Sequence, residues 1–188
     1  MEHNARFLKT IVAALEKNGE TAQESFGALS LAQLNWKPDK DVWSVGVILD
    51  HLIVTKRSYF PVFKEIVEDK YKMSFWTRWS PFSQVLGKTM VKNLGQNSKR
   101  KYATPPAFRS SLSRVEGNIM DQFLIAQGEL LELMEGLAEK ELRKIRIPSP
   151  ASSFLTYSCW QALRIIDVHE DRHFQQASRL MELPGFPQ

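Results

Sequence analysis

Residues 156–181 read TYSCWQALRIIDVHEDRHFQQASRLM, and this stretch decides the fold that the sequence predicts. Side chains at helical spacing define one inner face, made of Leu163, Ile166, His169, His173, Gln176 and Leu180. The stretch is therefore expected to form one long amphipathic helix. His169 and His173 are four residues apart on that face, so both imidazoles need polar partners inside the protein. A metal ion is an economical partner for such a pair.

Three earlier segments show the same helical periodicity. They cover about residues 2–17, 44–60 and 113–139. Ser44 is a good N-cap for the second of them, and Pro61 should kink or end it, because proline lacks a backbone N–H. Asn18 and Gly19 predict the end of the first. No segment shows sustained strand alternation, so the sequence predicts an all-α fold, a four-helix bundle in one domain over residues 1–188.

The connection between the second and third helices is about 40 residues long, far more than a tight helix–helix turn requires. A link of that length permits a crossover, so these two helices could run parallel. Ser80 and Pro81 are a typical N-cap and first-turn pair, and they predict a short helix toward Leu86 within the link.

The depth of the histidines along their helices can be compared. His51 lies about 10 Å from the start of the second helix, and the pair His169 and His173 lies about 15 Å from the end of the fourth. If these helices are antiparallel neighbours, all three imidazoles reach about the same level. Three protein ligands leave one coordination position open, which a catalytic metal needs and a structural zinc site lacks.

The composition limits what chemistry cysteine can supply and indicates the cellular compartment of the protein. The 188 residues include one cysteine, so an internal disulfide and a cysteine-based zinc site are both excluded. Cys159 is expected to be a buried small hydrophobic residue. No apolar run approaches the roughly 20 residues that span a bilayer, and the first residues form an amphipathic pattern unlike a signal peptide. These features predict a cytoplasmic protein without a membrane partner.

The sequence HEDRH at 169–173 also fits H-E-x-x-H, the signature of zinc proteases in which the glutamate activates water. The usual metzincin extension is absent, and Glu182 is the one acidic residue left downstream as a ligand. Glu170 projects about 100° away from the histidine face. A three-histidine site is therefore the better interpretation, with Glu170 as a bystander.

Two groups of motifs resemble the DinB/YfiT-like superfamily. The opening group is LNWKP at 34–38 with VWSVGVILDHL at 42–52, similar to the family's proline loop, W-S pair and helix with a histidine before leucine. The closing group is LT at 155–156, QAL at 161–163 and HEDRHFQQ at 169–176, similar to the family's H-x-x-x-H-x-x-Q ending. The resemblance covers nearly the whole chain in order.

This resemblance implies an up-down-down-up four-helix bundle whose second and third helices are parallel. It also implies a divalent metal ion, often nickel or zinc, bound by His51, His169 and His173, with Gln176 orienting a ligand or a bound water. Characterised members include thiol-dependent S-transferases, and others are described as metal-dependent hydrolases. We therefore expect a metal-dependent enzyme acting on a small molecule, with a low-molecular-weight thiol as cosubstrate and thiol transfer slightly ahead of hydrolysis.

Positive charge is concentrated in residues 71–114, which contain nine basic residues and no acidic one, in a chain of net charge +4. Aromatic residues interleave with Arg78, so single-stranded nucleic acid is one alternative ligand, but a crossover that packs its own aromatic side chains is favoured. If the segment lines the site, Arg78 and Arg109 are candidates for binding an acidic substrate. A further alternative is a metal-binding bundle without catalysis that acts through a protein partner or as a homodimer.

Overall fold

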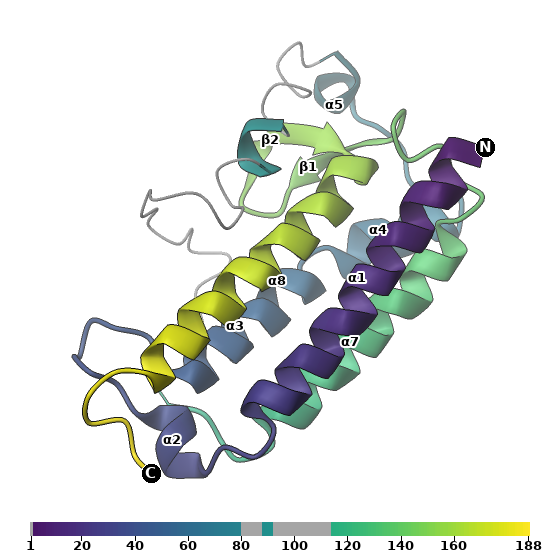
Figure 1. Cartoon of the computed structure of the whole chain (residues 1–188). Coiled ribbons are helices and arrows are strands. Elements are labelled where there is room, and N and C mark those ends of the chain that lie inside the picture. Colours follow the sequence, from purple (N-terminus) through teal and green to yellow (C-terminus); the bar gives the residue numbers. More distant parts are fainter. Residues whose placement is uncertain (1, 80–87, 92–113) are drawn as a thin grey trace.

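The computed structural model describes residues 2–79, 88–91 and 114–188, and it is mostly helical (Figure 1). Its helices and strands are α1 (Glu2–Phe26), α2 (Leu31–Asn35), α3 (Val45–Arg57), α4 (Phe60–Val67), α5 (Phe75–Trp79), α7 (Ile119–Gly136), β1 (Arg146–Ser149), β2 (Ser152–Ser158) and α8 (Cys159–Met181). The short helix predicted after Ser80 and Pro81 lies outside the described residues.

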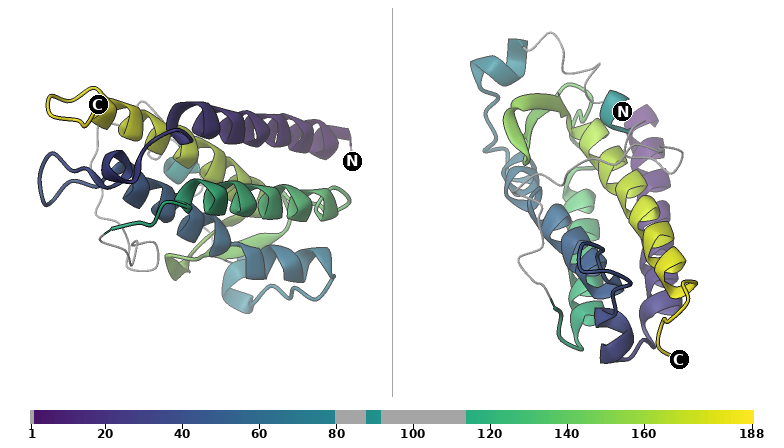
Figure 2. Two further views of the ribbon diagram at one scale, coloured as in Figure 1. Left: turned by 90° about the horizontal axis from the view of Figure 1, so that it is seen from below. Right: turned by 90° about the vertical axis from the view of Figure 1, so that its left-hand side faces the viewer.

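The four longest of these helices lie side by side. α1 contacts α7 and α8, and α3 contacts the same two helices. Figure 1 and Figure 2 show α3 and α7 running in one direction and α1 and α8 in the opposite one. α3 and α8 are therefore antiparallel neighbours, and residues in the middle of one helix lie level with residues in the middle of the other.

Local sequence explains where three of the helices begin. Ser44 caps α3 as predicted, since its side chain accepts the N–H of Val47. α8 begins with a capping box, in which Ser158 Oγ accepts the N–H of Gln161 and Gln161 Oε1 accepts the N–H of Ser158. Pro61 ends the predicted second helix, as expected: α3 stops before it, and α4 carries the proline in its first turn, where no N–H is needed.

The end of α1 and the start of α7 differ from the predicted helix boundaries. α1 continues past Asn18 and Gly19, which were expected to end it. Both residues are buried, Gly19 against Gln127 of α7, so tertiary packing outweighs the local stop signal. α7 begins at Ile119, later than predicted, because a turn that includes Gly117 precedes it.

The prediction of an entirely helical chain missed a two-stranded antiparallel hairpin, β1 and β2. Ile147 of β1 pairs with Tyr157 of β2, and both side chains are fully buried. β2 leads directly into α8, so residue 156, where a helix was predicted to start, belongs to a strand. The hairpin thus fixes the start of the helix that carries two of the histidines.

Two clusters of buried apolar side chains fill the space between the helices. One cluster contains, among others, Ile11, Leu15, Tyr59, Leu130, Leu163 and Ile166. The other contains, among others, Ala22, Ile48, Leu52, Ile53, Phe123 and Phe174. Both clusters draw on α1, α7 and α8, so the helices share one interior along their length. Among the described residues, no helix combines the length and the apolar character needed to cross a membrane.

Candidate metal centre

Three histidines from two helices meet between α3 and α8. His51 comes from α3, whereas His169 and His173 come from neighbouring turns of α8. His169 Nε2 lies 3.4 Å from His51 Nε2 and 3.1 Å from His173 Nε2. One ligand nitrogen of each ring lies within 4.8 Å of the other two, so the group could hold a metal ion. The structure thus brings together the three histidines that the sequence singled out.

The chemistry of this donor set fits a divalent metal ion. A neutral imidazole has one nitrogen that donates and one that accepts, so three Nε2 atoms in such close contact need a shared proton or cation between them. Desolvation by burial, and next the neighbouring His173 and His51, hold the pKa of His169 well below its usual range. Burial and then His51 lower the pKa of His173 to about 3, with Gln176 acting in the opposite direction. His169 and His173 are therefore neutral at pH 7, which is the form that binds metal.

Trp43 forms a wall beside the histidines. Its ring centroid lies 4.9 Å from that of His51 and 6.0 Å from that of His173, which it stacks on at an interplanar angle of 21°. The side chain comes immediately before the N-cap Ser44, so the cap that starts α3 also places the indole. In the sequence, Trp43 was noted as part of the W-S pair, and its contact with the imidazoles was not predicted. Gln176 lies half-buried beside His173, one turn further along α8.

Glu170 forms a buried ion pair, although the sequence predicted no specific role for it. Its side chain is buried, with Oε1 2.9 Å from Lys56 Nζ and Oε2 accepting from Asn18 Nδ2 at 3.1 Å. The carboxylate is therefore engaged in an ion pair inside the helix bundle. That position does not suit the water-activating base of an H-E-x-x-H site. No local sequence pattern marks Lys56 or Asn18 as its partners, because both are remote in the chain.

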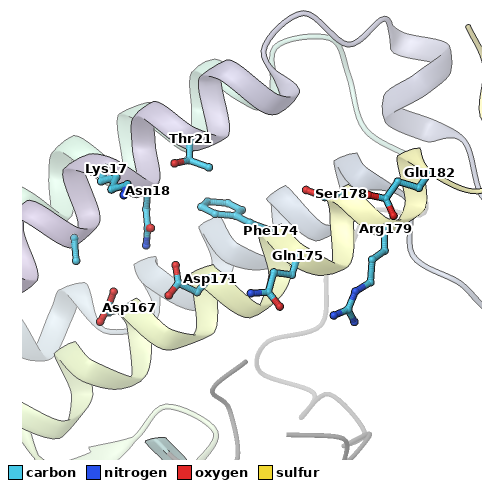
Figure 3. A pocket seen from close by; sticks show the side chains of 11 residues that line it. Lys17, Asn18, Thr21, Asp167, Asp171, Phe174, Gln175, Ser178, Arg179 and Glu182 are labelled. Atoms are coloured by element: carbon cyan, nitrogen blue, oxygen red, sulfur yellow. The ribbon is translucent and has the colours of Figure 1, made fainter. Parts of the chain in front are cut away.

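A separate groove of about 610 Å³ runs between α1 and α8 (Figure 3). Its walls include Asn18 and Thr21 of α1 and Asp167, Asp171 and Phe174 of α8. The aspartates project from the side of α8 opposite the histidine face, as their spacing in the helix requires. The three histidines do not line this groove, which is therefore distinct from the candidate metal centre.

Of the two arginines predicted to bind substrate, the structure describes Arg78. Arg78 is exposed on α5, and its backbone oxygen accepts from Arg146 Nη1 at 3.2 Å, which places it at the hairpin. Arg109 lies outside the described residues. Cys159 is buried, as predicted, and burial raises the pKa of its thiol to about 12. It is therefore not a nucleophile at neutral pH.

The fold and this cluster define a class of protein. It is a helical protein whose packed helices place three histidines where they could hold a metal ion. The chain belongs to the DinB superfamily, whose family profile matches residues 14–177. The uncharacterized protein YuaE of Bacillus subtilis (strain 168) is 27% identical over 164 residues, which cover 87% of this chain and 91% of that protein. No solved structure matches the chain significantly. Membership of this superfamily and the three-histidine cluster fit a metal-binding protein.

Proposed function

We propose that the chain is a metal-dependent enzyme in which His51, His169 and His173 bind one divalent metal ion, nickel or zinc, and that it transfers a thiol to a small-molecule electrophile. The convergence of the three Nε2 atoms carries this proposal. The opposed directions of α3 and α8 support the up-down-down-up bundle that such enzymes use.

His51, His169 and His173 as neutral imidazoles would leave the full charge of a divalent ion uncompensated, and such an ion would supply stabilisation of a thiolate or a lowered pKa of water at the site. The side chains around the proposed metal ion contribute to this chemistry through where they lie. The histidines leave a coordination position open, the Trp43 ring shields His51 and His173 from water on one side, and Gln176 lies where it can orient the bound group.

The contacts of Glu170 favour thiol transfer over hydrolysis. Hydrolysis by an H-E-x-x-H site requires a carboxylate that can take a proton from the attacking water. Here the carboxylate of that signature is paired with Lys56 inside the bundle. A thiol has a much lower pKa than water, so a metal ion held by the three histidines would favour its thiolate form without help from such a base. Hydrolysis of a small molecule is the second candidate.

The test of this proposal begins with metal content. Protein purified without added metal is analysed by mass spectrometry, stripped with a chelator and titrated with Ni²⁺ or Zn²⁺ by calorimetry. We expect one equivalent per chain, and addition of glutathione or cysteine to the Ni²⁺ form should produce a thiolate-to-nickel charge-transfer band. Absence of metal uptake would remove the metal proposal. Uptake with no such band for any small thiol would leave hydrolysis as the better assignment.

A further inference from the structure

A buried polar layer crosses the helix bundle close to the histidines. It consists of Asn18 on α1, Lys56 on α3, Gln127 on α7 and Glu170 on α8, one residue from each of the four longest helices. Their exposed fractions are 7%, 1%, 3% and 1%, so none of the four relies on solvent for its polar contacts. Polar groups buried to this degree need partners inside the protein.

The four side chains contact one another. Lys56 Nζ lies 2.9 Å from Glu170 Oε1 and donates to Gln127 Oε1. Glu170 Oε2 accepts from Asn18 Nδ2 at 3.1 Å and from Gln127 Nε2 at 3.3 Å. Gln127 Nε2 also donates to the backbone oxygen of Leu15 at 2.7 Å. The layer is therefore a connected network that contains one cation and one anion.

The layer lies at the boundary between the two apolar clusters. Along α8, Ile166 belongs to one cluster and Phe174 to the other, with Glu170 midway between them. Along α1, Leu15 and Ala22 flank the layer in the same way. Sliding one helix by a turn would move a charged group into an apolar cluster without its partner, which is strongly unfavourable. The layer thus permits one register of the helices.

We propose that the ion pair of Lys56 and Glu170 is a positioning device that sets the register of α3 on α8 and thereby holds His51 against His169 and His173. The inference rests on the metal-binding function proposed above. His51 precedes Lys56 by five residues on α3, and His169 is adjacent to Glu170 on α8. The ion pair and the histidine cluster are therefore two contacts between the same two helices, and fixing one fixes the other.

On this proposal, the ion pair of Lys56 and Glu170 sets the register of α3 on α8 more than it adds to the free energy of unfolding. Removing one partner of a buried ion pair strands a charge, whereas replacing both with apolar residues of similar volume often leaves stability unchanged or higher. A double apolar replacement is therefore able to separate the two roles. The ion pair of Lys56 and Glu170 disfavours other registers of α3 on α8. Two apolar residues at these positions would discriminate less between registers, because neither needs a specific partner.

The test compares the full chain with its Lys56→Met/Glu170→Met variant. Co²⁺ is the metal probe, since its visible absorption reports coordination geometry, and amide hydrogen exchange of α3 is a readout that needs no metal. We expect the variant to fold, to bind Co²⁺ about 10-fold more weakly with an altered spectrum, and to exchange faster in α3. The matched control is Arg57→Gln/Glu129→Gln, which removes an ion pair between α3 and α7 whose side chains are 44% and 43% exposed. The control should bind Co²⁺ like the parent.

A folded double variant with the parental Co²⁺ affinity would overturn the positioning role. If that variant does not fold, Lys56→Gln/Glu170→Gln, which keeps hydrogen-bonding groups at both positions, replaces it in the same comparison. Failure of both variants to fold also overturns the proposal, since the pair would then serve the fold itself. If the parent binds no Co²⁺, the metal function fails separately. Amide exchange then decides alone, with faster exchange in α3 supporting the register role and unchanged exchange overturning it.

Discussion

His51 and His169 are 118 residues apart in the chain, yet their Nε2 atoms lie 3.4 Å from each other. The contact depends on the antiparallel packing of α3 and α8, because each histidine lies near the middle of its helix. His173 completes the group from the next turn of α8, 3.1 Å from His169. The cluster is therefore a property of the tertiary fold, and both helices should matter equally for metal binding.

The first prediction follows from the equal importance of α3 and α8 for metal binding. His51→Ala should weaken Ni²⁺ or Zn²⁺ binding as much as His169→Ala does, by about 100-fold or more, because each variant reduces a three-donor site to two donors. Calorimetric titration of the stripped proteins measures the effect. His3→Ala is the control, since it removes the remaining histidine of the chain. Metal loss confined to the α8 variants would show that His51 is not a ligand.

The second prediction concerns Trp43, whose ring lies 4.9 Å from that of His51. Ni²⁺ bound by the histidines should quench the fluorescence of this indole, because a paramagnetic ion at such short range offers a non-radiative path. Titration of the parent with Ni²⁺ should therefore lower the tryptophan emission to a plateau at one equivalent. Trp43→Phe should remove most of that change while metal uptake continues.

Trp36→Phe is the matched control for this measurement. Trp36 packs edge-on against Phe186 at a centroid distance of 5.4 Å. Its replacement should leave the Ni²⁺-dependent quenching in place. Equal loss of quenching in both variants would contradict the position assigned to Trp43.

Local signals predicted where each histidine lies on its helix, whereas the meeting of His51 with the other two was predicted only if the second and fourth helices are antiparallel, as the family resemblance also implied. Helical spacing joins His169 to His173, and the N-cap Ser44 sets the depth of His51 on its helix. The ion pair of Lys56 and Glu170 could not be predicted in this way, since the two residues are 114 positions apart and their contact depends on which helix faces meet. The hairpin strands were also missed, because β1 alternates over only four residues and β2 shows no regular alternation of burial.

The third prediction concerns the single cysteine. Burial raises the pKa of Cys159 to about 12, and its side chain is inaccessible in the fold. Iodoacetamide at mildly alkaline pH should therefore label the native chain no faster than global unfolding allows. Labelling in denaturant should be rapid and complete, and that sample is the positive control. Rapid labelling of the native protein would show that the start of α8 opens locally.

The fourth prediction concerns two tyrosines whose hydroxyl oxygens lie 2.6 Å apart in the interior, Tyr59 and Tyr157. Tyr157→Phe strands the hydroxyl of Tyr59 and should lower the free energy of unfolding by about 1–3 kcal/mol. Tyr59→Phe should cost less, because the hydroxyl of Tyr157 keeps its hydrogen bond with Ser149. The double variant should lose less than the sum of the two single losses, because the hydrogen bond between the two tyrosines can be lost only once. Urea unfolding of the four proteins measures the coupling, and strict additivity would contradict a direct hydrogen bond.

The same pair makes stability depend on alkaline pH. Burial raises the pKa of Tyr157 to about 12 and that of Tyr59 well above 10.0, the ordinary value that applies in the unfolded chain. Above pH 10 the unfolded chain therefore loses protons that the folded chain retains, so the free energy of unfolding falls as the pH rises toward 12. The slope is about 1.4 kcal/mol per pH unit for each tyrosine. The double variant lacks both phenols, and its free energy of unfolding should fall less steeply over this range. Parallel curves for parent and double variant would show that other groups cause the alkaline loss.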